Sequence, residues 1–279
     1  MTVYADLAGI EIGDGFPVRL LGAINISPES FYKGSIASTE DVLRRQAERM
    51  AAEGADMIDV GAMSSAPYLE TEVSEAEEIE RLVRAVRVIR KTVDVPISVD
   101  TTRSRVAISA LDVGAAIVND ISGFRNDPAM AEVAARRSAG AILMASEASP
   151  GAQHPMPEVL NLLRHSLTLA KTAGFPEGRV VIDPGIGFFR KAADPWDAWD
   201  CAIIRRLADL RELGRPILIG LSRKSFIGKI LERPDPGERL AGSLAATAIA
   251  VVNGAHMVRT HDVGSSRDAI RVAEALRPR

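Results

Sequence analysis

Short apolar runs recur along the chain, and most of them end abruptly in polar residues. The clearest is the run that begins at Ile217, which is followed by a hydroxyl, two cations and a second hydroxyl in Ser222–Ser225. A continuous apolar run of this length predicts a strand that is buried on both faces, as in a parallel sheet covered by helices. The pattern therefore predicts a parallel strand whose carboxyl end carries polar side chains.

Seven other short runs have the same form, and segments with apolar residues at helical spacing separate them. The eight predicted strands are 20–26, 57–61, 96–100, 117–120, 141–144, 180–183, the run from 217, and 257–259. The predicted helices include one that begins after Ser38 or Thr39, either of which is a good N-cap, and others at 72–92, 197–213 and 239–253. Repeated strand–helix units predict a parallel sheet, and eight of them predict closure into a (β/α)8 TIM barrel. An open doubly wound sheet is the alternative.

The segment before the first barrel strand has a different pattern. Residues 3–18 predict a β-hairpin, with Gly13, Asp14 and Gly15 in its turn. No low-complexity segment, long linker or shift in composition marks a boundary between domains. Residues 1–279 are therefore expected to form a single domain, somewhat longer than the roughly 250 residues of a typical barrel.

Composition narrows the classes of function. The chain has 34 basic and 37 acidic residues and a net charge of −3, so no basic field attracts nucleic acid. A single cysteine, Cys201, excludes internal disulfides and a metal site built from cysteines. No apolar run is as long as a membrane span, and Asp6 and Glu11 argue against a signal peptide. We therefore expect a cytoplasmic protein that binds neither nucleic acid nor membranes.

Polar residues at the predicted strand ends are the candidates for chemistry, because the carboxyl ends of barrel strands share one rim, where such enzymes act. They are Asn25, Asp59, Asp100 with Thr101, Asn119 with Asp120, Asp183, Ser222–Ser225, and Arg259–Asp262. At any one position, the alternative explanation is that a polar residue follows the strand only because loops are polar. However, burying such groups without partners costs roughly 1–3 kcal/mol each, so a structural role would require every one to be paired. The pattern favours one shared cavity.

One set of these residues suits a flat heterocycle with mixed donors and acceptors. Asn119, Asp183 and Lys224 offer an amide, a carboxylate and an ammonium group. A carboxylate accepts two hydrogens from an aminopyrimidine edge, and a lysine donates to a ring carbonyl or nitrogen. Gly185 and Gly187, which follow Asp183, would let the backbone approach a ligand closely, or they serve a turn.

A second set suits an anion. Asn25, Arg259 and His261 offer an amide, a guanidinium and an imidazole. The side-chain carbonyl of Asn25 is also a candidate ligand for Mg²⁺, which prefers oxygen ligands and phosphate partners. The other histidines lack such a context and are expected to be structural or exposed.

The segments around these residues resemble those of the dihydropteroate synthase family, and the likeness extends over nearly the whole length of the chain. The matching segments are Ala23–Phe31, Gly54–Gly61, Ser98–Thr101, Val118–Gly123, Asp183–Phe188, Gly220–Gly228 and Arg259–Val263. The resemblance implies a TIM-barrel transferase of folate biosynthesis. Such an enzyme joins a dihydropterin pyrophosphate to p-aminobenzoate or a related arylamine, with Mg²⁺, and releases pyrophosphate.

The resemblance also implies roles for individual residues. It places the pterin pocket at Asp100, Asn119, Asp183 and Lys224, the pyrophosphate pocket at Asn25, Arg259 and His261, and the p-aminobenzoate contacts at Phe188 and Ser225. It makes Asn25, Lys224, Arg259 and His261 the catalytic group, with Asn25 as the metal ligand. Pyrophosphate would leave first, and the amine would then attack the electron-poor methylene. A homodimer is also implied, with the Ala-rich segment 241–250 as one candidate surface, although such segments more commonly pack inside a fold.

The chain departs from the family pattern in three loops. Lys33 stands where the family usually has aspartate, Ala66 stands where it has arginine, and Ala145-Ser146 replaces the usual His-Met. These changes leave the arylamine acceptor open. They are also the only support for one alternative function, a non-catalytic pterin-binding protein. A second alternative is a pterin-dependent methyltransferase domain, which shares the barrel and the pterin pocket. The run Ser222–Phe226 and the run Arg259–His261 favour the synthase, because methyl transfer needs no pyrophosphate pocket.

Overall fold

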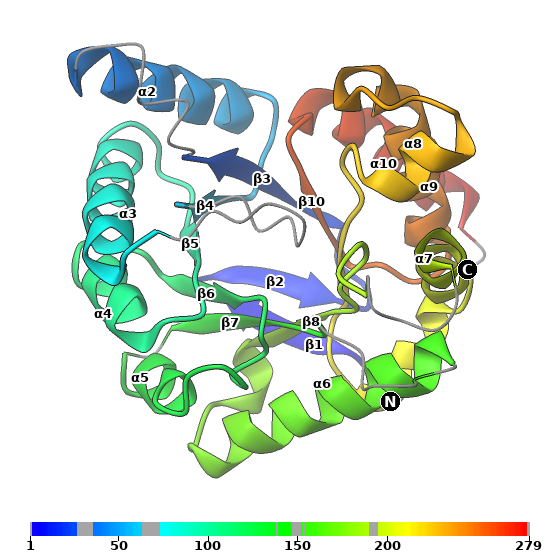
Figure 1. The fold of residues 1–279 in the computed structure, drawn as a ribbon, viewed down its shortest axis with the longest axis horizontal. Helices are drawn as coiled ribbons and strands as arrows, with labels where there is room; N and C mark the ends of the chain where they lie inside the picture. The colour runs from blue at the N-terminus through cyan, green and yellow to red at the C-terminus, as the bar shows by residue number, and fades with distance from the viewer. Residues whose placement is uncertain are drawn as a thin grey trace.

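The fold is a barrel of eight parallel strands surrounded by helices, as the sequence predicts (Figure 1). A computed structural model describes residues 2–26, 36–62, 73–137, 139–146, 152, 154–189 and 195–277. Lys33 and Ala66 lie outside these described residues. None of the helices in the described segments has the length and apolarity needed to cross a membrane.

The barrel strands follow one another in nearly sequential order around the sheet. They are β3 (Arg19–Asn25), β4 (Met57–Gly61), β5 (Ile97–Asp100), β6 (Ile117–Asp120), β7 (Gly140–Met144), β8 (Val180–Asp183), β9 (Leu218–Gly220) and β10 (Met257–Thr260). Each starts within one residue of its predicted position. The order is β8-β7-β6-β5-β4-β3-β10-β9, and a parallel bridge between Ile182 and Ile217 joins its two edges. This closure confirms the barrel and excludes the open sheet.

Helices cover the outer face of the barrel. They are α2 (Ile36–Ala52), α3 (Glu75–Arg90), α4 (Ser104–Asp112), α5 (Met130–Arg136), α6 (Pro155–Thr172), α7 (Trp196–Arg205), α8 (Ser225–Ile230), α9 (Leu240–Val252) and α10 (Val263–Leu276). The described segments also contain three short 3-10 helices, η1 (Glu177–Arg179), η2 (Leu207–Leu213) and η3 (Pro236–Arg239). The predicted helix 197–213 is two elements in the structure, because the α-helix α7 ends at Arg205 and the chain continues as the 3-10 helix η2.

Two predicted boundaries are wrong. The hairpin is β1 (Tyr4–Leu7) paired with β2 (Ile10–Gly13), and its turn lies at Ala8-Gly9 rather than at Gly13–Gly15. Both turn residues have positive φ, and the Asp6 carboxylate accepts from the Gly9 N–H. The second error is the start of α2, which begins at Ile36, before either predicted cap residue.

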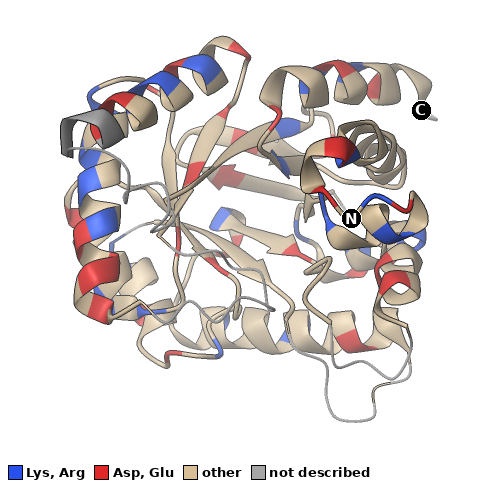
Figure 2. Ribbon diagram, turned by 45° about the horizontal axis from the view of Figure 1, so that its top comes forward, with Lys and Arg blue, Asp and Glu red and all other residues tan. Residues whose placement is uncertain are grey.

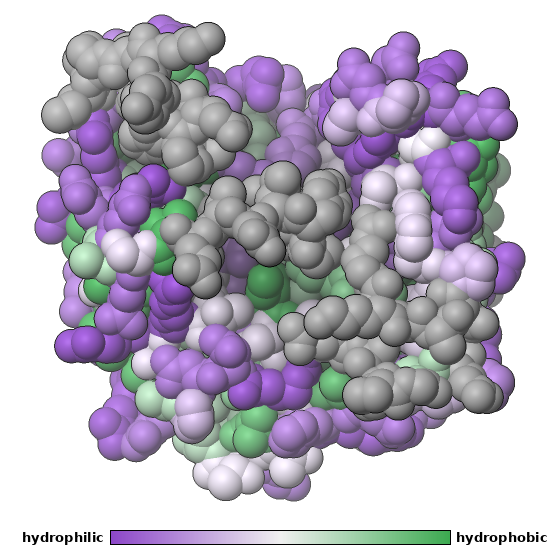
Figure 3. All heavy atoms as spheres, in the orientation of Figure 1, coloured by the Kyte–Doolittle hydropathy of each residue, from purple (hydrophilic) through white to green (hydrophobic). Residues whose placement is uncertain are grey.

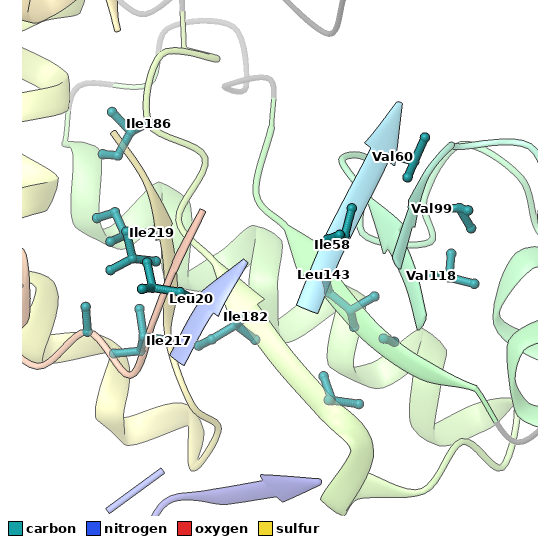
Figure 4. Packing of buried hydrophobic residues seen from close by; sticks show 14 of the residues in the cluster. Leu20, Ile58, Val60, Val99, Val118, Leu143, Ile182, Ile186, Ile217 and Ile219 are labelled. Atoms are coloured by element: carbon teal, nitrogen blue, oxygen red, sulfur yellow. The ribbon is translucent and has the colours of Figure 1, made fainter. Parts of the chain in front are cut away.

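Side chains of the barrel strands alternate between two cores with a period of two. Outward side chains pack with the helices, and Figure 4 shows Ile58, Val60 and Val99 among them. Inward side chains near the amino ends of the strands form a separate apolar cluster, which includes Leu21, Met57, Ile117, Ile142, Val181, Leu218 and Met257. Because of the period, the residue two positions later on each strand also faces inward, nearer the carboxyl end.

The hairpin closes the bottom of this inner cluster. Ala5, Leu7 and Ile12 are fully buried and belong to the same cluster as the inward strand residues. A Cβ on Gly140, the first residue of β7, would lie 2.8 Å from Leu7 Cδ2, so the hairpin packs directly against the start of that strand. The amino-terminal end of the barrel is therefore filled by apolar side chains, and the other end is left for polar groups.

Asp14 ties the chain after the hairpin to the barrel. Its carboxylate accepts from Arg211 Nη1 at 2.8 Å and Nη2 at 2.7 Å, and from the Val3 N–H at 3.0 Å. We expect Asp14→Asn to lower the free energy of unfolding at pH 7 by about 1 kcal/mol, since the pair is partly exposed and screened. Urea denaturation of both proteins measures this difference.

The pH dependence of that difference has a definite sign. The hydrogen bonds from Arg211 lower the pKa of Asp14 below its usual range. The stabilisation is therefore complete above the unfolded pKa of about 3.9 and is lost as the pH falls towards the folded pKa. Wild type and Asp14→Asn should converge in stability at acid pH. Asp41→Asn, which affects an exposed pair with Arg44, is the matched control and should change stability less. A difference that grows on acidification would contradict the assignment.

Candidate active site

Above the apolar cluster, the inward positions of the barrel are mostly polar. Each lies two residues after an inward residue of the lower layer, as Asp59 does after Met57. The upper layer comprises Asp59, Asp100, Asn119, Asp183 and Arg259, together with Ala23, Met144 and Gly220. Figure 2 marks acidic and basic positions on strands inside the ring of helices. The strand period thus collects on one level the polar residues that the sequence places at separate strand ends.

Asp59 is the centre of this layer. Its side chain is fully buried, and Oδ2 accepts from Arg259 Nε at 2.7 Å and from Asn119 Nδ2 at 3.1 Å. Among the described residues, Asp59 Oδ1 has no hydrogen-bond partner. One carboxylate therefore orients a guanidinium from β10 and an amide from β6. The sequence analysis places Asp59 within the predicted strand 57–61 and gives it no role; the signal was a charged residue in an otherwise apolar strand.

Arg259 lies between two carboxylates. In addition to its bond to Asp59, its Nη2 is 3.5 Å from Asp100 Oδ2. One cation between two acids leaves this group with a negative charge. Burial and the Asp59 charge raise the pKa of Asp100 to about 7, although Arg259 opposes the shift. The raised pKa favours the protonated form of Asp100, which would remove the excess negative charge of this group.

Asp183 and Lys224 face the same part of the barrel mouth. Burial raises the pKa of Asp183 to about 6, while the Gly185 N–H, 2.7 Å from Oδ1, and the charge of Lys224 favour its ionised form. Lys224 Nζ lies 4.7 Å from the centroid of the Phe188 ring. A Cβ on Gly185 would lie 1.7 Å from the Ala145 carbonyl oxygen, so this glycine is needed for contact with the end of β7. The carboxylate, the ammonium and the aromatic ring thus come from one compact region.

His261 and Asn25 form a second group. Asn25 Nδ2 lies 3.4 Å from His261 Nε2, and His261 Nδ1 lies 3.1 Å from Ser222 Oγ. If the amide donates to Nε2, the proton of the neutral ring is on Nδ1 and faces Ser222. Burial and the neighbouring Arg259 lower the pKa of His261 to about 4. In that tautomer both ring nitrogens are engaged, so the ring can donate to an anion only in the other tautomer, with the Ser222 hydroxyl donating to Nδ1 and the proton on Nε2. In either tautomer the positive charge comes from Arg259.

The structure brings the predicted residues together with one change in grouping. Arg259, assigned from the sequence to the anion set, contacts Asp59, which had no assigned role, and Asp100, which belongs to the heterocycle side. It therefore borders both sets. Ser225 begins α8 directly after Lys224. His256, expected to be structural, is buried and accepts the Ile217 N–H at 3.1 Å.

Comparisons with known proteins agree with this geometry. A family model described as pterin binding enzyme matches residues 21–261. A dihydropteroate synthase from Synechocystis is 39% identical over 264 residues, which cover 92% of this chain and 89% of that protein. A solved dihydropteroate synthase from Xanthomonas albilineans with 4-aminobenzoic acid is 32% identical, with a TM-score of 0.88, over 99% of this chain and 98% of its own. The enzyme from the same organism in complex with 7,8-dihydropteroate is 32% identical, with a TM-score of 0.85, over 98% of both chains.

Proposed function

Because the chain belongs to the dihydropteroate synthase family of transferases, we propose that its polar layer holds a dihydropterin pyrophosphate for attack by an arylamine. The observation that carries this proposal is the buried group around Asp59, which places Asn119, Arg259 and Asp100 on one level of the barrel. Complementary hydrogen-bonding groups of this kind suit a pterin ring, which carries donors and acceptors along its edges. The likeness to synthases solved with an arylamine and with dihydropteroate supports the same substrates here.

The pterin would be held by its polar edges. The ionised Asp183 carboxylate accepts two hydrogens from the aminopyrimidine edge, and Lys224 donates to a ring carbonyl or nitrogen. Asn119, oriented by Asp59, offers its amide oxygen. Asp100, with its pKa near 7, is placed to exchange a proton with a ring nitrogen. The low exposure of these groups makes each hydrogen bond stronger than it would be in water.

The pyrophosphate would lie towards Asn25, Arg259 and His261. Arg259 supplies the positive charge, and His261 would donate from Nε2–H when the Ser222 hydroxyl donates to its Nδ1. The described residues contain no cluster of three or more histidine, cysteine or acidic side chains positioned for a metal. Asn25 Oδ1 would be a ligand for Mg²⁺, which takes few protein ligands and binds mainly to phosphate and water. When bound, the ion would neutralise charge on the departing pyrophosphate.

The reaction would proceed in two steps. The bond between the methylene carbon and the pyrophosphate oxygen breaks first, and the electron pair leaves with pyrophosphate, whose charge Arg259 stabilises. The arylamine nitrogen then bonds to the electron-poor methylene and loses a proton. Phe188 and Ser225 would contact this second substrate from beside Lys224.

Pyrophosphate release tests the proposal directly. Purified protein with Mg²⁺, a dihydropterin pyrophosphate and p-aminobenzoate should release pyrophosphate and form a pterin–arylamine product detectable by mass spectrometry. Omission of either substrate should abolish product. Pterin binding without product would indicate a non-catalytic binding protein and overturn the proposal.

The substituted loop positions predict a slow reaction with plain p-aminobenzoate. This prediction rests on the sequence, because Lys33 and Ala66 replace the family's aspartate and arginine. A lysine near a cation that forms in a poorly solvated site is unfavourable. The double variant Lys33→Asp, Ala66→Arg should therefore raise kcat with p-aminobenzoate in a steady-state assay. An equal or lower kcat would exclude these two positions as the cause.

We also propose a homodimer in the cytoplasm. Large apolar side chains are exposed on or beside three adjacent helices, at Ile230 of α8 and Leu231 directly after it, at Ile249 and Val252 of α9, and at Val272 and Leu276 of α10. Figure 3 shows apolar atoms at the right-hand edge, beside α8 and α9. The Ala-rich segment 241–250 contributes Ile249 to this face. Sedimentation analysis should give the mass of two chains; a monomer at micromolar concentration would contradict this.

A further inference from the structure

Arg223 lies between Ser222 and Lys224 but takes no part in the proposed binding of either substrate. Its backbone is left-handed, with φ of +56°, which is uncommon for a residue with a Cβ. Its backbone N–H donates to Ser243 Oγ at 2.8 Å, and its carbonyl accepts from Arg239 Nη1 at 3.1 Å. Such a conformation costs about 1–3 kcal/mol and persists only where the surrounding structure enforces it.

The Arg223 side chain joins the loops that follow β9 and β10. Its Nε and Nη2 donate to the two carboxylate oxygens of Asp262 at 2.9 and 2.8 Å. Its Nη1 donates to the carbonyls of Pro236 and Gly237, both at 3.1 Å. The guanidinium therefore connects three segments at the barrel mouth, and the paired bonds to Asp262 fix its orientation.

Asp262 gives up a local hydrogen bond to make this contact. It is the N-cap residue of α10, a position where an aspartate usually accepts from a backbone N–H of the first turn. Its side chain makes no such capping bond here. Because a capping bond is worth typically about 1 kcal/mol, its loss indicates that the contact with Arg223 dominates at this position.

The contact lies directly beside the proposed site residues. Ser222, one residue before Arg223, contacts His261, one residue before Asp262. Lys224, one residue after Arg223, carries the ammonium beside Phe188. Two consecutive side-chain pairs, Ser222–His261 and Arg223–Asp262, thus hold the loop after β9 against the loop after β10. The distance between the Lys224 ammonium and the His261 imidazole depends on this arrangement.

We propose that Arg223 is a positioning residue that, through Asp262, fixes Lys224 relative to His261 and so aligns the pterin with its pyrophosphate. The inference rests on the proposed function, in which those two side chains bind opposite ends of one substrate. A displacement of about 1 Å between groups that act on one reacting bond can cost on the order of 100-fold in rate. A merely structural role would lower stability and leave the rate of the folded enzyme unchanged.

Arg223→Gly is the main test, because glycine adopts positive φ without strain and removes only the side chain. Arg223→Lys is the second variant, since lysine keeps the charge but cannot make two parallel bonds to a carboxylate. Asp262→Asn removes the charge of the partner. The matched control is Arg215→Gly at the other end of β9, where Arg215 pairs with Glu177 far from the site residues. Circular dichroism establishes that each variant is folded at the assay temperature.

We expect kcat/KM of Arg223→Gly to fall about 100-fold, mainly through kcat, with a smaller loss in Arg223→Lys. Asp262→Asn should reproduce the loss, and the double variant Arg223→Gly, Asp262→Asn should be no worse than the more severe single one. Arg215→Gly should keep the wild-type rate. The chain has only four histidines, so nitrogen NMR can follow the His261 ring, whose signals should shift in Arg223→Gly but not in Arg215→Gly.

Equal rates in the folded Arg223 and Arg215 variants, or an unchanged His261 signal in Arg223→Gly, would overturn the proposal. Additive losses in the double variant would also overturn it, because the two residues would then act independently. If the wild-type protein forms no pterin–arylamine product, the proposed function fails instead. The His261 signal is read without substrate, so it still reports whether Arg223 positions the loop.

Discussion

Replacing Asp183 with asparagine should weaken pterin binding by about 1.5–3 kcal/mol, the usual scale for a hydrogen bond to a charged group. The Asp183 carboxylate is buried and is placed near Lys224 at the mouth of the barrel. Asparagine has the same shape, but it has only one acceptor oxygen and carries no charge to match two pterin hydrogens. Calorimetry with a pterin that lacks phosphates measures this loss of affinity without any contribution from the pyrophosphate pocket.

The matched control is Asp56→Asn at the opposite end of the barrel. Asp56 accepts from the Leu20 N–H at 2.7 Å and pairs with Arg19, so its loss should lower stability without changing pterin affinity. Unchanged pterin binding in a folded Asp183→Asn protein would remove Asp183 from the pocket. An equal loss of affinity in both variants would show that the effect is not local.

The raised pKa of Asp183 also predicts how pterin affinity depends on pH. Burial raises its pKa to about 6, and only the ionised form accepts both hydrogens. The dissociation constant of wild type should therefore rise as the pH falls below about 6. Asp100 is present in both proteins, so the difference between the two slopes isolates Asp183. We expect the slope of log Kd against pH to be shallower in Asp183→Asn.

Replacing Arg259 with alanine should have two large effects. It leaves the Asp59 and Asp100 carboxylates without their shared cation, and breaking such a buried pair costs about 3–5 kcal/mol of stability. It should also weaken the binding of dihydropterin pyrophosphate more than the binding of a phosphate-free pterin, because the charge that the anion needs is lost. Urea denaturation and calorimetry with the two ligands measure these effects.

Arg259→Lys provides a milder variant if the alanine variant does not fold. Lysine keeps the charge, so it should retain more affinity for the pyrophosphate ligand. Arg19→Ala is the control, since Arg19 pairs with Asp56 at the amino-terminal end of the barrel. It should reduce stability less than Arg259→Ala and leave both affinities unchanged. Equal losses for the two ligands in Arg259→Ala would place this residue on the pterin side alone.

The barrel fold was predictable from the sequence, and so was the position of the polar residues near the carboxyl ends of its strands. Both depend on local periodicity. Short apolar runs mark strands, and a period of two fixes which residues face inward. Asp183 follows Val181 by two positions, and Arg259 follows Met257 in the same way. Once eight strands form one barrel, such residues must meet at one level.

The contacts between distant residues could not be predicted in the same way. Asp59 accepts from residues 60 and 200 positions away, and no local pattern shows that it orients Asn119 and Arg259. The grouping of Arg259 with the acids follows from barrel closure, not from its neighbours in sequence. The hairpin turn was misplaced because Gly13–Gly15 has typical turn composition, whereas the real turn uses Ala8 with positive φ.

A crystal structure with a bound dihydropterin pyrophosphate analogue would test the central claim most directly. We expect the aminopyrimidine edge within hydrogen-bonding distance of Asp183, the ring beside Asn119 and Lys224, and the phosphates next to Arg259 and His261. The pterin would then lie on the polar layer, two residues above the apolar floor of the barrel. A pterin bound away from Asp183 and Lys224, or phosphates directed away from Arg259, would contradict this assignment.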